Sequence, residues 1–195
     1  MTEREVVMTG IGGQGIQLAA QVLCRAALAE GREIQLFGSY GGMMRGGNTE
    51  ATVVVADAAV ESPPTVGRAW GALVMHHEHF DPVHRLLRPG SVVMLNTTVF
   101  EGSFERDPFV VVEVPATELA GGVGNVMAAS MVMLGAFSRA TGIVTLASLQ
   151  RAVPEALPPY RAQHAALNGA ALETGYGAVD RVQAEAWPAH QGVGP

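Results

Sequence analysis

The sequence contains no lysine, and all 12 basic residues among its 195 residues are arginines. Schiff-base enzymes, pyridoxal-phosphate sites and Walker-A phosphate loops each need a lysine amine, so this absence excludes all three. Charged residues make up 15% of the chain, and the formal net charge is −6. Because this balance disfavours non-specific binding to phosphate backbones and anionic lipids, we expect no nucleic acid and no membrane as a partner.

Cysteine is equally scarce, with Cys24 as the single example. One thiol cannot hold an iron–sulfur cluster or a cysteine-type zinc site, and it cannot form an internal disulfide. This composition suits a reducing cytoplasm, which is the expected location, and we expect no signal peptide. The longest uncharged run, residues 119–138, is interrupted by glycines in its first third, so it predicts a buried helix from about residue 125 rather than a membrane span.

Strand and helix patterns alternate along the chain. Strands are expected at 5–9, 33–37, 49–56, 71–75, 91–95 and 109–114. Helices are expected at 16–29, 78–87, 116–120, 125–141, 145–153 and 159–174. The order predicts an α/β fold, a Rossmann-like layered sandwich with a mostly parallel and possibly mixed sheet and a helical C-terminal part. We expect one domain over residues 1–178 and a C-terminal tail over 179–195.

The 24 glycines include a turn of the form Gly10-x-Gly12-x-x-Gly15 between the first strand and the first helix, with Gly13 and Gln14 inside it. This is the setting of a dinucleotide-binding fingerprint, in which the helix N-terminus faces a phosphate. Nicotinamide dinucleotides also need an acidic residue at the end of the second strand, where this chain has only Gly38, Ser39 and Tyr40. Three interpretations stay open: a tight packing turn, another anionic ligand, or a partner segment at the helix start.

A second glycine loop follows the second strand and contains the only cation of the two loops, Arg45. In open α/β sheets, ligands bind beyond the carboxyl ends of the strands, where both loops are expected to emerge. Arg45 would there face a phosphate or a carboxylate, or alternatively pair with Glu50 or Asp57. The candidate ligand- or partner-binding residues of this loop are Ser39, Tyr40, Gly41, Arg45, Gly46 and Gly47.

Together the two loops resemble those of the gamma subunit of the 2-oxoacid:ferredoxin oxidoreductases. The similar segments are Gly-Ile-Gly-Gly-Gln-Gly-Ile (10–16) and Ser-Tyr-Gly-x-x-Met-Arg-Gly-Gly (39–47). Later segments agree in order, among them Leu-Leu-Arg-Pro-Gly (86–90), Met-Val-Met-Leu-Gly-Ala (131–136) and Leu-Asn-Gly-Ala-Ala-Leu-Glu-Thr-Gly (167–175). The resemblance covers about residues 5–178. The residues of the second glycine loop are closer to those of 2-oxoglutarate or branched-chain enzymes than to those of pyruvate enzymes.

The resemblance implies a function for a complex rather than for this chain alone. Such enzymes oxidatively decarboxylate a 2-oxoacid to an acyl-CoA and pass two electrons to ferredoxin. Thiamine diphosphate, Mg²⁺ and iron–sulfur clusters would lie on alpha, beta and delta partner subunits, with coenzyme A as co-substrate. This chain would carry no cofactor and no catalytic residue, and its glycine loops would frame coenzyme A or contact a partner. The rival interpretations are a stand-alone Rossmann-type nucleotide-binding module and an assembly subunit without a ligand.

Two further features have open roles. His76, His77 and His79 follow the fourth strand, and because adjacent side chains diverge we expect an edge turn there rather than a metal site, with His79 available to a ligand or partner. The 125–141 helix is apolar nearly all round, which predicts burial in the domain core or against a partner subunit.

Overall fold

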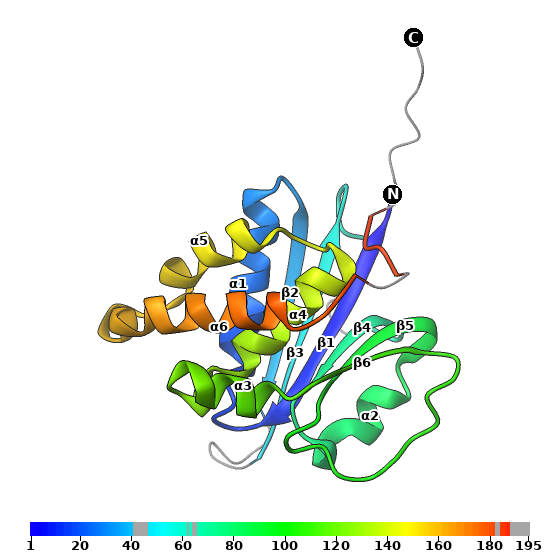
Figure 1. The fold of residues 1–195 in the computed structure, drawn as a ribbon. Helices are drawn as coiled ribbons and strands as arrows, with labels where there is room; N and C mark the ends of the chain where they lie inside the picture. The colour runs from blue at the N-terminus through cyan, green and yellow to red at the C-terminus, as the bar shows by residue number, and fades with distance from the viewer. Residues whose placement is uncertain (41–46, 62, 64–65, 182–183, 188–195) are drawn as a thin grey trace.

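The computed structural model describes residues 1–40, 47–61, 63, 66–181 and 184–187 (Figure 1). Within these residues, six strands form one sheet in the order β2-β3-β1-β4-β5-β6. The strands are β1 (Glu3–Ile11), β2 (Glu33–Tyr40), β3 (Asn48–Ala56), β4 (Ala69–Val74), β5 (Leu87–Asn96) and β6 (Val110–Val114). β3 runs antiparallel to β1 and β2, while β1, β4, β5 and β6 are mutually parallel. The expected mostly parallel, mixed sheet is therefore confirmed.

Helices cover the two faces of the sheet unequally (Figure 1). The larger layer holds α1 (Ile16–Ala29), α3 (Ala116–Val123), α4 (Ala129–Thr141), α5 (Leu146–Ala156) and α6 (Ala165–Gly177). The opposite face carries α2 (Phe80–His84). The described residues also form three short 3-10 helices, η1 (His77–His79), η2 (Val126–Ala128) and η3 (Pro159–His164). Alternation along β1 separates the layers, because Val6 and Met8 join the large core while Val7 joins the small one.

Three of the expected helices differ from the structure, and one of them, 159–174, is the 3-10 helix η3 followed by α6. The expected 78–87 helix ends at His84, and Leu87 already belongs to β5, which begins four residues earlier than predicted. Gly90 has a φ of +81°, and its N–H is bonded to Pro108 O at 2.8 Å, so the Pro-Gly pair shapes the strand instead of ending a helix. The expected 125–141 helix starts as the 3-10 turn η2, where Asn125 Oδ1 caps the N–H of Met127 at 2.9 Å.

Two glycines allow α4 and α6 to cross in backbone contact. A Cβ atom added at Gly135 would collide with the carbonyl oxygen of Leu172, and one added at Gly175 with that of Val132. The crossing holds α4 inside the domain, where its residues from Ala129 to Ser138 are buried. Burial in this domain's own core therefore accounts for the apolar helix. No helix within the described residues combines the length and apolarity needed to span a membrane.

Part of the predicted C-terminal tail packs on the domain. Ala186 is fully buried, and its N–H donates to Thr141 O at 2.8 Å while its carbonyl accepts from Arg4 Nε at 2.5 Å. Trp187 Nε1 donates to Ile143 O at 2.9 Å, and the Arg32 guanidinium lies 3.8 Å from the Trp187 ring centroid. Residues 184–187 thus close the end of the domain that lies away from the glycine loops, while the division at residue 178 stays a prediction.

The helix crossing gives a direct stability prediction. Gly175→Ala should lower the free energy of unfolding by about 3 kcal/mol or more, because a methyl group in a backbone contact can be accommodated only by separating α4 from α6. Gly169→Ala lies in the same helix, and an added Cβ meets no atom within 4 Å there. This control should be neutral or more stable by up to about 1 kcal/mol, since alanine favours helix. Urea unfolding of both variants checks the contrast, and equal effects would contradict the crossing.

Candidate functional site at the carboxyl edge of the sheet

The two glycine loops meet at one edge of the sheet. In the pairing of β1 with β3, Ile11 lies opposite Asn48, and in the pairing of β2 with β3, Tyr40 lies opposite Thr49. A backbone hydrogen bond of 2.9 Å from Gly12 N to Gly47 O joins the loops directly. Of the candidate residues, Gly10, Gly12, Gly13, Gln14, Gly15, Ser39, Tyr40 and Gly47 lie along this edge, whereas Gly41, Arg45 and Gly46 fall outside the described residues.

The first glycine turn is braced by its own glutamine. Gln14 Oε1 accepts the N–H of Ile11 at 2.9 Å, and Gln14 Nε2 donates to Met75 O at 3.4 Å. Gly13 and Gly15 have φ angles of +107° and +78°, a region that side chains with a Cβ rarely adopt. A Cβ at Gly10 would lie 2.5 Å from Gln14 Oε1. Gln14 and these glycines therefore shape the turn, and what they offer to a ligand is backbone.

A second glutamine holds α1 against the outer strands. Gln17 Nε2 donates to Glu50 O at 2.8 Å, and a Cβ added at Gly38 would lie 2.5 Å from Gln17 Oε1. Gly38 therefore serves close packing between β2 and α1. Ser39 follows on β2 as an exposed residue. The two carboxylates considered as partners of Arg45 lie at opposite ends of β3. Glu50 lies at the end next to the second glycine loop, whereas Asp57 follows the far end and accepts the N–H of Thr2 at 2.8 Å.

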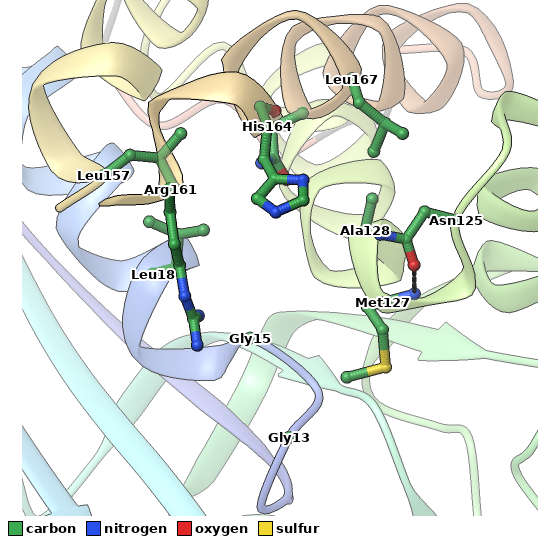
Figure 2. Close-up of a pocket in the computed structure, with 11 residues that line it drawn as sticks. Gly13, Gly15, Leu18, Asn125, Met127, Ala128, Leu157, Arg161, His164 and Leu167 are labelled. Carbon is green, nitrogen blue, oxygen red and sulfur yellow. Dashed lines mark hydrogen bonds between the residues drawn. The ribbon is translucent and has the colours of Figure 1, made fainter. Parts of the chain in front are cut away.

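A pocket of about 340 Å³ opens beside the first glycine turn (Figure 2). Its walls come from the start of α1, from η2 and from the segment joining α5 to α6. The lining residues are Gly13, Gly15, Leu18, Asn125, Met127, Ala128, Leu157, Arg161, His164, Leu167 and Asn168. The side chains of Arg161 and His164 extend into this space from η3, above Gly15 (Figure 2).

The pocket concentrates positive charge and hydrogen-bond donors. The first intrahelical bond of α1 is Ala19 N to Gly15 O, so the N–H groups of residues 16–18 precede the ladder at the positive end of the helix dipole. The Arg161 guanidinium contacts only the neighbouring Tyr160 ring, 5.6 Å from its centroid, among the described residues. Asn168 is fixed by its Nδ2 donating to His164 O at 2.9 Å. An anion with an apolar portion, packed on Leu18, Met127 and Leu167, fits this arrangement.

Sequence reasoning missed Arg161, His164, Asn125 and Asn168. They lie over a hundred residues after the glycine turn: Asn125 reaches it at the start of η2, and the other three reach it through η3 and α6. The one local signal is an Arg and a His just after Pro158-Pro159 at the start of a helical segment. That signal gives no indication of what the helix start faces.

The histidine segment forms the edge turn that was expected. His76 Nδ1 accepts the N–H of Glu78 at 3.2 Å, and burial lowers the pKa of His76 below its ordinary value. His77 Nδ1 lies 3.1 Å from Val99 O and 3.2 Å from Glu101 N. Within the described ranges, no group of three His, Cys, Asp or Glu residues could hold a metal ion. Cys24 is buried in α1, and burial raises the pKa of its thiol to about 12.

A family model described as pyruvate ferredoxin/flavodoxin oxidoreductase matches residues 5–178 of the chain. The chain belongs to this family. The matched residues coincide with those over which the glycine loops and later segments resemble the gamma subunits in sequence. Gly135 and Gly175, which allow the α4–α6 crossing, lie in two of the segments that carry this resemblance.

Members and structural neighbours of the family carry consistent names. The 2-oxoglutarate synthase subunit KorC of Methanothermobacter thermautotrophicus is 34% identical over 80% of this chain and 86% of that protein. The pyruvate oxidoreductase subunit PORC of Thermotoga maritima has a TM-score of 0.73 at 27% identity, covering 92% of this chain and 98% of that one. The 2-oxoglutarate:ferredoxin oxidoreductase of Magnetococcus marinus has a TM-score of 0.79 at 16% identity over 95% of this chain and 34% of that one, which shows a shared fold.

Glu50, at this edge of the sheet, is expected to make the stability of the folded chain depend on pH. Burial raises the pKa of its half-buried carboxyl above the ordinary value. Between the unfolded-state pKa and this raised one, the folded chain binds more protons than the unfolded chain, so stability falls as pH rises through that window. Glu50→Gln should therefore be more stable than the wild type at pH 8, and the difference should shrink at pH 4.

Thermal unfolding of the isolated chain at both pH values measures this difference. Glu173→Gln, which replaces an exposed carboxylate on α6, is the matched control and should show no comparable gain at pH 8. A Glu50→Gln variant that is less stable than the wild type at pH 8 would contradict the account, because it would mean that the carboxylate is satisfied within the chain.

Proposed function

We propose that this chain is the gamma subunit of a 2-oxoacid:ferredoxin oxidoreductase and that its pocket at the start of α1 holds part of coenzyme A. The complex would convert a 2-oxoacid and coenzyme A to an acyl-CoA and CO₂, with two electrons passing to ferredoxin. We propose 2-oxoglutarate as the first substrate to test, because the KorC subunit of Methanothermobacter thermautotrophicus is 34% identical to this chain and the PorC subunit of the same organism is 31% identical. The alpha, beta and delta partners and a cytoplasmic location belong to the same proposal.

The observation that supports the coenzyme A site is an arginine and a histidine that lie over a helix N-terminus. Arg161 and His164 line the pocket together with the glycine turn that precedes α1, and the free N–H groups there suit a phosphate oxygen. Leu18, Met127 and Leu167 offer apolar contact to the adenine or the pantetheine arm. A volume of about 340 Å³ is smaller than coenzyme A, so the remainder would extend toward a partner subunit.

The residues present do not fit the redox cofactors of such a complex. A cluster needs several thiolates, and the single thiol of this chain, Cys24, is buried in α1 with its pKa raised to about 12. We therefore assign the iron–sulfur clusters, thiamine diphosphate and its Mg²⁺ to the partner subunits. The chain's own contribution would be to bind and orient coenzyme A and to fix the partners around it.

The rival nucleotide-binding function fits the sheet poorly. In the dinucleotide-binding fold, the second strand lies beside the first, so that its terminal acid reaches the ribose next to the glycine turn. Here β3 lies between β1 and β2, which moves the end of β2 outward by about 5 Å, one strand spacing. The exposed Ser39, not an acid, lies near that end.

The proposal predicts that Arg161→Ala weakens coenzyme A binding in the assembled enzyme. The KM for coenzyme A should rise about tenfold, the loss of one charge-assisted hydrogen bond, while kcat and the KM for the 2-oxoacid stay close to the wild type. Arg151→Ala, an exposed arginine on α5 outside the pocket, is the control and should leave all three constants unchanged.

The assay is ferredoxin reduction by the complex recovered through a tag on this chain, with 2-oxoglutarate and pyruvate compared. The isolated chain should show no turnover, and activity should need the partner subunits. An unchanged coenzyme A KM for Arg161→Ala would refute the pocket assignment. Tight binding of NAD by the isolated chain in calorimetry would instead support the nucleotide-binding module.

A further inference from the structure

A set of polar groups gathers on the sheet face opposite α1, next to the second glycine loop. Asn48 and Glu50 alternate along β3 with Ala51 and Val53, which belong to the core under α1, so the two polar side chains lie on the other face. Thr9 of β1 lies directly across from Glu50, and its Oγ1 donates to His79 O at 3.4 Å. η1 is thereby held over this part of the sheet.

Asn48, His79 and Glu50 each carry a hydrogen-bond acceptor that no described residue pairs with a donor. Asn48 Oδ1 and His79 Nε2 are buried without a hydrogen-bond partner, and His79 Nε2 can accept when the ring proton is on Nδ1. The Glu50 carboxylate is half-buried and forms no ion pair or hydrogen bond with another described residue. Leaving buried acceptors unpaired costs free energy, so two of them beside a half-buried carboxylate call for a donor that the described residues do not supply.

The chemistry missing from this place is a positively charged donor. A guanidinium or ammonium group carries several N–H donors, no acceptor and a positive charge, which complements an amide oxygen, an imidazole nitrogen and a carboxylate. The neighbouring edge strand adds an apolar platform, because Phe37 is 43% exposed and lies on the same face, two residue pairs along from Ser39 and Glu50. The aliphatic stem of a long cationic side chain would pack there.

We infer that Asn48, Glu50 and His79 receive an arginine or lysine side chain of a partner subunit. The inference rests on the proposed function, which supplies the partner, and adds the place of contact and its chemistry. It also accounts for the desolvation that raises the pKa of the Glu50 carboxyl, since the partner's charge would offset that desolvation in the complex. The contact lies on the opposite sheet face from the coenzyme A pocket and beside the same pair of glycine loops.

The test compares assembly with the stability of the isolated chain. In a complex recovered through a tag on this chain, Glu50→Gln should weaken the apparent affinity for partner subunits at least about tenfold, because the partner's cation is left buried without its counter-charge. Dissociation on dilution, followed by sedimentation, measures the affinity. Glu173→Gln, the exposed control on α6, should assemble like the wild type.

The isolated Glu50→Gln chain should melt no lower than the wild type at pH 8, which separates a contact role from a folding role. Unchanged assembly would overturn the inference, and so would weaker assembly accompanied by a lower melting temperature, since the carboxylate would then act within the fold. If the wild-type chain recovers no partner subunits at all, the proposed function fails and the inference falls with it. Normal wild-type assembly with a normal Glu50→Gln complex removes the inference alone.

Discussion

The antiparallel pairing of β3 with β1 is the constraint on which the rest of the structure depends. It places Asn48 opposite Ile11, so the second glycine loop returns to the first, and the bond from Gly12 N to Gly47 O joins them. It also displaces β2 by one strand, which removes the geometry that a nicotinamide dinucleotide needs beside the glycine turn. Because β3 lies between β1 and β2, the two glycine loops lie side by side at this edge of the sheet, which is called the two-loop rim below.

The rim presents different chemistry on its two sides. On the side of the large helix layer, Arg161, His164 and the start of α1 form a positively charged pocket with apolar walls. On the other side, Asn48, Glu50 and His79 offer acceptors without donors. The first suits a phosphate-bearing ligand and the second a cationic side chain, so ligand and partner would be bound by opposite faces of one sheet edge. The chain in this account contributes binding surfaces rather than reactive groups.

Local patterns predicted the architecture because each element carries its own signal. The apolar face of α1, the alternation of β3 and the glycine turn between β1 and α1 are legible within a few residues. The start of β5 was missed because Leu87 and Arg88 continue a helical pattern that only the sheet interrupts. The pocket was missed because Arg161 and His164 reach the glycine turn through the α4–α6 crossing, which depends on backbone contact at Gly135 and Gly175. Residues brought together by such a crossing share no spacing in the sequence.

The central claim is that the carboxyl edge of the sheet is where this chain meets its ligand and partners. Hydrogen–deuterium exchange of the isolated chain compared with the assembled complex tests it most directly. The account predicts added protection in residues 10–18, 47–50, 125–128 and 157–168, with further protection of 157–168 when coenzyme A is present. It predicts little change at the opposite edge, in residues 2–5 and 57–61. Protection confined to that opposite edge would contradict the account.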